Sequence, residues 1–128
     1  MIILDEDIDT HQRQQLEAWK IRFRYIGMHV GWFGMKDRNN VIPLLHRLRR
    51  PTFFSRDHGF YDRELRHRGY CLVHLDVSPK EAAEYVRRFL RHPSFRTQAQ
   101  RMGKVVRVRH SGLAWWEIGA KVERAVSW

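Results

Sequence analysis

The sequence has a single cysteine and no long run of apolar residues. The lone cysteine, Cys71, cannot form an internal disulfide, and its apolar neighbours favour a buried thiol in a reducing compartment. No stretch approaches the roughly 18 apolar residues of a membrane span, and the acids that follow residues 1–4 do not resemble a signal peptide. We therefore expect a cytoplasmic protein with no membrane partner.

Several patterns of common enzymes and metalloproteins are also missing. The eight histidines include no close pair at the spacing of zinc ligands. There is no glycine-rich phosphate loop and no Ser-His-Asp pattern. Repeats and low-complexity linkers are absent too, and 128 residues suit one domain, so we expect a single domain over residues 1–128.

Acidic residues are few compared with basic ones. There are 14 Asp and Glu against 24 Lys and Arg, which gives a net charge of +10. Most of the basic residues are arginines, which suit planar, bidentate contacts with phosphate. Such a positive field favours nucleic acid, an anionic membrane surface or an acidic protein as a partner. The simpler interpretation is that the arginines lie on solvated faces.

The apolar pattern alternates between strands and helices. Strands are expected at 2–4, 21–25, 52–55 and 70–77, and a hairpin is expected around Ser111-Gly112. Helices are expected at 10–19, 39–49, 61–69, 79–92 and 95–102, with a further short helix before Trp128. This alternation predicts an α/β fold, a three-layer α/β/α arrangement with a mainly parallel central sheet and a C-terminal β-hairpin.

Acidic residues follow the predicted strands where parallel sheets bind ligands. Asp5 follows the first strand, Asp57 follows the strand at 52–55, and Asp37 precedes the second helix. These positions meet at one end of a parallel sheet. Three carboxylates gathered there repel one another unless a divalent cation joins them, and oxygen ligands suit Mg²⁺ or Mn²⁺. The simpler interpretation of each acid is a helix cap or a turn residue.

These residues resemble the PIN-like domains, small metal-dependent nucleases found among bacterial and archaeal toxin–antitoxin toxins. The resemblance rests on IILDED at the N-terminus, on Asp37 before the central helix, and on TFFSRDHGF at 52–60. It covers residues 1–77 in order and spacing, and the rest in outline. It implies a PIN-like fold and a ribonuclease that holds Mg²⁺ or Mn²⁺ with Asp5, Asp37 and Asp57. A metal-activated water would attack the phosphodiester in line.

The chain departs from that family at the fourth acidic position. Two residues after Asp57, where the family has a second Asp, this chain has Gly59. Asp62 and Glu6 are candidates to supply a further carboxylate. The alternative is a catalytically weakened PIN-like module that binds nucleic acid or protein without cleaving it.

The expected partner is RNA, most simply a single strand, although the sequence does not separate RNA from DNA. An antitoxin protein and a second copy of the chain are further candidate partners. The candidate contacts to the strand are Ser55, Arg56, His58, Arg63, Arg66 and Trp32. Ser55 would orient an acid or a phosphate, and Trp32 is suited to stack on an unpaired base. The alternatives are core or dimer packing for Trp32 and a plain surface position for His58.

Overall fold

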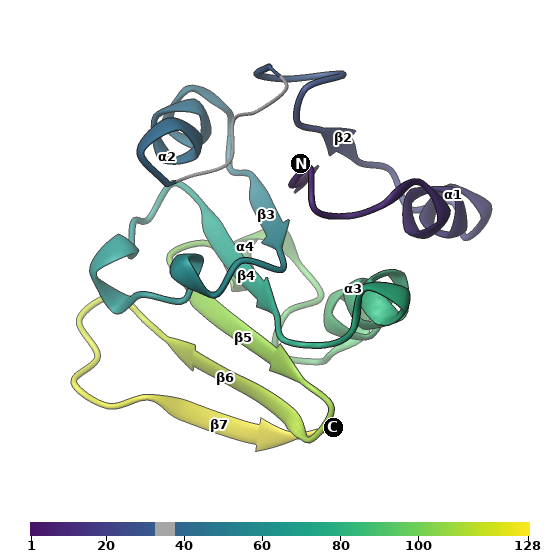
Figure 1. Cartoon of the computed structure of the whole chain (residues 1–128). Coiled ribbons are helices and arrows are strands. Elements are labelled where there is room, and N and C mark those ends of the chain that lie inside the picture. The colour runs from purple at the N-terminus through teal and green to yellow at the C-terminus, as the bar shows by residue number, and fades with distance from the viewer. Residues whose placement is uncertain (33–37) are drawn as a thin grey trace.

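The computed structural model describes residues 1–32 and 38–128. In these residues seven strands form one sheet, with the order β2-β1-β3-β4-β5-β6-β7 (Figure 1). The strands are β1 (Ile2–Leu4), β2 (Arg24–Tyr25), β3 (Thr52–Ser55), β4 (Cys71–Leu75), β5 (Val105–Arg109), β6 (Gly112–Trp116) and β7 (Arg124–Ser127). The α-helices are α1 (Thr10–Ala18), α2 (Arg38–Arg47), α3 (Ala82–Arg91) and α4 (Gln98–Arg101). Short 3-10 turns are η1 (His58–Phe60), η2 (Arg63–Leu65) and η3 (Pro79–Glu81).

The sheet is mainly parallel. Strands β2, β1, β3, β4 and β5 run parallel to one another, β6 runs antiparallel to β5, and β7 runs antiparallel to β6. This confirms the predicted α/β class, and β5 and β6 form the predicted hairpin. The strand order changes direction at β1, because β2 lies on one side of β1 and β3 lies on the other. Ligands of such sheets bind beyond the carboxyl ends of the strands at this switch point.

Two apolar clusters lie on opposite sides of the sheet, because neighbouring residues of a strand point to opposite faces. Leu4 packs in a cluster with Leu16 of α1 and Phe89 of α3. Ile3 packs in a second cluster with Leu45 of α2. Figure 1 accordingly shows α1 and α3 on one side of the sheet and α2 on the other. The carboxyl ends of β1 and β3 lie between these helices.

Helix starts follow the capping residues in the sequence. Asp9 caps α1, with its carboxylate accepting the N–H of Gln12 over 3.0 Å. Helix α2 starts at Arg38, ahead of the predicted start, so Pro43 lies inside the helix rather than in its first turn. Proline cannot donate a helical hydrogen bond. Burial of the α2 stripe against the second cluster offsets that cost.

The sequence-based prediction is wrong in three segments. Residues 61–69 form no α-helix but only the short turn η2, which Asp62 caps. The predicted strand at 21–25 shortens to β2, since Lys20 has a positive φ of 61° that turns the chain just before it. The final residues form strand β7 instead of a helix, because the open edge of β6 offers unpaired backbone groups.

Two predictions from composition concern the interior and the membrane. Cys71 is fully buried, as expected, and burial raises the pKa of its thiol to about 12. The thiol is therefore protonated and unreactive at neutral pH. Across residues 1–32 and 38–128, no helix combines the length and the apolar character that crossing a membrane requires.

Candidate active site

Ser55, the last residue of β3, is the centre of the candidate site. Its side chain is fully buried, and its Oγ lies 2.7 Å from Oδ2 of Asp5 and 3.1 Å from Oδ2 of Asp7. The backbone N–H of Asp57 donates to the same Oγ over 3.0 Å. The carboxylates of Asp5 and Asp7 and the backbone of Asp57 therefore meet around one hydroxyl group at the switch point of the sheet. We call Asp5, Asp7 and Asp57 the acidic cluster.

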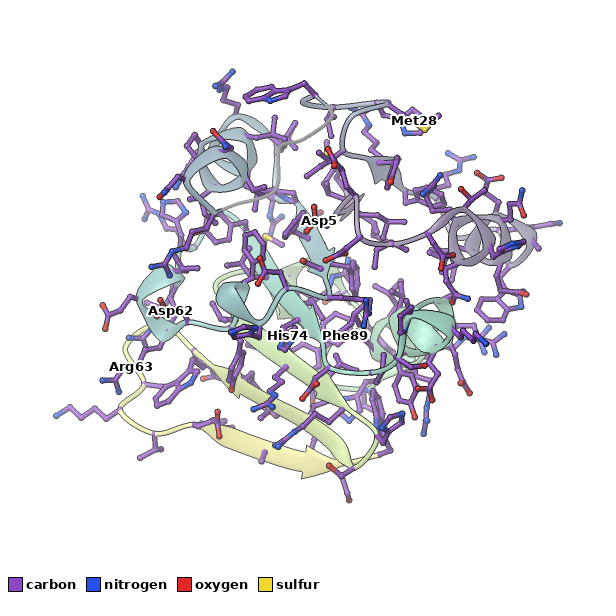
Figure 2. The ribbon with its side chains drawn as sticks, in the orientation of Figure 1. Asp5, Met28, Asp62, Arg63, His74 and Phe89 are labelled. Carbon is purple, nitrogen blue, oxygen red and sulfur yellow. The ribbon has the colours of Figure 1, made fainter. Side chains whose placement is uncertain are left out.

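The ends of β1 and β3 bring these residues together. The N–H of Asp5 donates to the carbonyl of Phe54 over 2.9 Å, which extends the β1–β3 pairing by one residue. The N–H of Ile8 then donates to the carbonyl of Asp5 over 3.1 Å, and this tight turn brings Asp7 back over β3. The Asp7 carboxylate also accepts the N–H of Arg56 over 2.9 Å. Figure 2 shows Asp5 near the middle of the molecule, between the strands and the helices.

Ser55 cannot donate a hydrogen bond to both carboxylates at once, so two ionised carboxylates lack one donor. A serine hydroxyl donates a single hydrogen bond. Oγ already accepts the N–H of Asp57, and it faces an oxygen of Asp5 and an oxygen of Asp7. Either one of these carboxylates carries a proton of its own, or a cation must compensate two facing oxygens that share one donor.

The same crowding of carboxylates shifts the pKa values of Asp5 and Asp7. Burial, and then the nearby charge of Asp7, raises the pKa of Asp5 to about 7, although hydrogen bonds from Ser55 and Glu6 oppose this rise. Burial of its carboxyl group also raises the pKa of Asp7, with a further contribution from the charge of Asp57. The ionised form of Asp5 is therefore poorly compensated by the protein alone at neutral pH.

The carboxylate of Asp57 is turned toward the chain that follows it. Its Oδ1 accepts the N–H of Gly59 over 2.8 Å, and Asp57 is the cap of η1. The cap interpretation is thus correct for this side chain as it stands. Its charge still raises the pKa of Asp7, so the two acids lie close enough to interact. The structure therefore brings Asp5 and Asp57 to one edge of the sheet, as the sequence predicted.

The other predicted acids are placed differently. The backbone carbonyl of Glu6 accepts the hydroxyl of Tyr25 over 2.9 Å, beside the acidic cluster. Asp62 caps η2 and pairs with Arg38 at 2.7 Å, and Figure 2 shows it well apart from Asp5. Asp37 lies outside the residues that the structure describes.

The residues predicted to contact an RNA strand fall into two groups. Trp32 is 55% exposed, which excludes packing into the core of its own chain. His58 is also exposed and its ring lies 6.5 Å from that of His74. Arg63 and Arg66 lie instead over the ring of Trp116, at 5.3 and 6.0 Å. Arg66 also donates to the carbonyls of Glu117 and Ala120, so this side chain is engaged within the protein.

Sequence reasoning missed Asp7 and His74. Asp7 belongs to the same LDED stretch as Asp5, and the signal was the two-residue spacing of these acids at the start of a turn. His74 stands in an otherwise apolar strand and pairs with Ser55 in the sheet register, so both side chains face the same side. A histidine in a buried strand next to a predicted site was the available signal.

The described residues offer a partial set of metal ligands. Among them, no group of three His, Cys, Asp or Glu side chains is arranged to hold a metal ion. Asp5 and Asp7 do converge, and carboxylate oxygens suit Mg²⁺ or Mn²⁺. A third carboxylate would have to come from Asp57 on leaving its cap, or from Asp37. Two carboxylate oxygens face the single hydroxyl donor of Ser55, and a bound cation would compensate their charge.

Comparison with known proteins gives no family for this chain. No family model, no curated protein and no solved structure matches it. The resemblance to PIN-like domains therefore stays a prediction from the residues, and the function is argued from the site.

Proposed function

We propose that the chain is a nuclease that uses Mg²⁺ or Mn²⁺ to hydrolyse single-stranded RNA. The observation that carries the proposal is the acidic cluster at the switch point, where two carboxylates face one hydroxyl group. A divalent cation would compensate this like-charge pair through oxygen ligands. The net charge of +10 supports an anionic polymer as the substrate. The PIN-like, three-layer arrangement belongs to the same proposal, supported by helices on both faces of the sheet.

In this proposal each residue of the cluster has a distinct role. Asp5 and Asp7 hold the cation, and Ser55 fixes the distance between their two oxygens. Asp57 lies beside the other two acids and would supply a further carboxylate on leaving its cap. When bound, the cation lowers the pKa of a water molecule and compensates the charge that develops on the phosphate. Arg56 and His58 lie one and three residues after Ser55 and would contact the RNA strand.

Cleavage of a 5′-labelled single-stranded RNA tests the proposal. With Mg²⁺ or Mn²⁺ the wild type should cleave, and EDTA should stop the reaction. Asp5→Asn removes the charge that holds the cation, so we expect cleavage to fall about 10³-fold, since cation catalysis contributes several kcal/mol. Asp57→Asn should also reduce the rate. Glu17→Gln, an exposed acid on α1, is the matched control and should cleave like the wild type.

Cleavage that persists in EDTA, or that Asp5→Asn leaves unchanged, would overturn the proposal. RNA binding that weakens with salt, without cleavage in any metal, would favour the alternative of a binding module. One observation supports that alternative, namely the Asp57 carboxylate that is occupied as the cap of η1.

Gly59 offers a way to separate the two candidates. A side chain there would meet Asp57, because its Cβ would lie 3.2 Å from Oδ1 of that residue. Gly59→Asp should therefore shift the Asp57 carboxylate by a few tenths of an ångström and add the carboxylate that PIN-like domains have at this position. We expect metal-dependent cleavage to rise severalfold in Gly59→Asp.

Gly59→Ala is the control for that substitution, because it displaces Asp57 equally and adds no charge. The missing carboxylate limits activity only if Gly59→Asp cleaves faster than Gly59→Ala under the same metal. Equal rates in the two variants would show that position 59 contributes no ligand.

A further inference from the structure

The register of the sheet continues from the acidic cluster across one face. Ser55 pairs with His74, and His74 pairs with Arg107 on the next strand. Paired residues point to the same face, and neighbouring strands lie about 4.8 Å apart. His74 and Arg107 therefore follow Ser55 on the same face, at about 5 and 10 Å. Arg109 lies two residues further along β5 and faces the same side.

His74 is a buried polar side chain that lacks a partner for one nitrogen. It is 4% exposed, and its Nδ1 makes no hydrogen bond with any described residue. A buried polar group without a partner costs free energy, so native structures rarely keep one unless a ligand or water completes it. The exposed ring of His58 lies 6.5 Å away, at the side where η1 crosses this face.

Two arginines on β5 have donors to spare on the same face. Arg107 uses its Nε and Nη2 on Asp76, at 3.1 and 2.7 Å, and a guanidinium group has five N–H donors. The Arg107 side chain remains 36% exposed. Arg109 has a buried Nε with no hydrogen-bond partner in the described part of the chain. His74, Arg107 and Arg109, which we call the donor cluster, thus carry polar atoms that the protein itself satisfies only in part.

The acids near the donor cluster do not neutralise it. Asp76 pairs with Arg107. Among the described residues, it is the only carboxylate that contacts the donor cluster. Glu123 lies further along, where its carboxylate accepts the hydroxyl of Tyr61. The cluster therefore carries more donors and more positive charge than its surroundings compensate.

We propose that the donor cluster binds backbone phosphates of a single nucleic-acid strand that continues from the acidic cluster. Arginine N–H groups and a histidine N–H are common donors to phosphate oxygens. Ser55, His74 and Arg107 lie in line across the sheet, and Arg107 is the exposed end of this row, where a strand would first meet the protein. The position of the scissile phosphate at the acidic cluster rests on the proposed function, whereas phosphate binding at the donor cluster does not.

The test is the affinity for a fluorescein-labelled oligouridylate, measured by anisotropy in EDTA so that no metal-dependent cleavage occurs. Arg107→Met should weaken binding about tenfold, as expected for the loss of a charged hydrogen bond. It should also reduce the slope of log K against log salt by about 0.7, the value for one phosphate contact to a single strand. Asp76→Asn should tighten binding, because it frees Arg107 and removes a repelling carboxylate.

Arg91→Met is the matched control, because it removes the same charge from an exposed arginine of α3, on the opposite side of the sheet. His74→Leu separates an effect on binding from an effect on folding. It removes a buried nitrogen that has no partner, so its loss should not destabilise the fold. We expect this variant to be at least as stable as the wild type and to bind the oligonucleotide several times more weakly.

Equal weakening by Arg107→Met and Arg91→Met would overturn the inference, as would unchanged binding by His74→Leu. RNA cleavage that depends on Asp5, with binding indifferent to the donor cluster, would refute this inference and leave the proposed function intact. Binding that depends on the donor cluster, without cleavage in any metal, would refute the nuclease and leave the phosphate site intact.

Discussion

In EDTA, the free energy of unfolding of the wild-type protein should fall by about 4 kcal/mol relative to that of Asp5→Asn as the pH rises from about 4 to about 7. Burial and the neighbouring Asp7 raise the pKa of Asp5 from its ordinary value of 3.8 to about 7 in the folded protein. Asp5 therefore binds more protons in the folded state than in the unfolded state over this range, so its contribution to the free energy of unfolding is full below pH 4 and is lost above pH 7. The raised pKa of Asp7 acts in the same direction. Burial lowers the pKa values of His67, His74 and His92, and these groups act in the opposite direction in both proteins that are compared.

Asp5→Asn should remove most of this pH dependence and should stabilise the protein at pH 8. An asparagine amide can donate to Ser55 while its oxygen accepts the N–H of Glu6, which reproduces the hydrogen bonds of a protonated Asp5. Urea unfolding at several pH values measures the effect, and Glu17→Gln serves as the control. A difference in unfolding free energy between the wild type and Asp5→Asn that stays constant between pH 4 and 7 would contradict the burial of an uncompensated carboxylate at this position.

The fold class was predictable because it depends on local patterns. Short apolar runs bounded by acids marked β1 and β3, and Ser78-Pro79 marked the start of the segment that leads into α3. These signals lie within a few residues of one another. They carry over to the structure because burial of the apolar stripes supports the same elements.

The misassigned segments depend on interactions that no local pattern contains. Strand β7 forms because β6 offers an open edge, and residues 124–127 alone have no strong strand pattern. Residues 56–68 follow the sheet surface through caps at Asp57 and Asp62 rather than through a helical stripe. Both outcomes require knowledge of which sheet edge or face lies nearby.

The candidate site was predictable in part for the same reason. Asp5 and Asp57 follow strands that end at the same edge, so their proximity follows from the parallel sheet alone. The involvement of Asp7 depends on the turn at Ile8, and that of His74 depends on the pairing of β3 with β4. Neither contact could be derived without the register, because a shift of one residue would turn each side chain to the other face.

Divalent cations should restore the stability that the protein loses at high pH when Asp5 ionises. At pH 8 Asp5 is mostly ionised, because its pKa is about 7, and a cation that binds only the folded protein stabilises it by mass action. At a concentration of 100 times its dissociation constant, the gain is about 2.7 kcal/mol, or roughly 10 °C in melting temperature for a domain of this size. Asp5→Asn lacks the ionised carboxylate, so the gain should be lost.

The measurement that tests the cation site most directly is a titration of the melting temperature with Mn²⁺ at pH 8, for the wild type, Asp5→Asn and Glu17→Gln. We predict a saturable rise in the wild type and in Glu17→Gln, and little or no rise in Asp5→Asn. An equal rise in all three proteins, or no rise in the wild type at millimolar Mn²⁺, would contradict a divalent cation site at the acidic cluster.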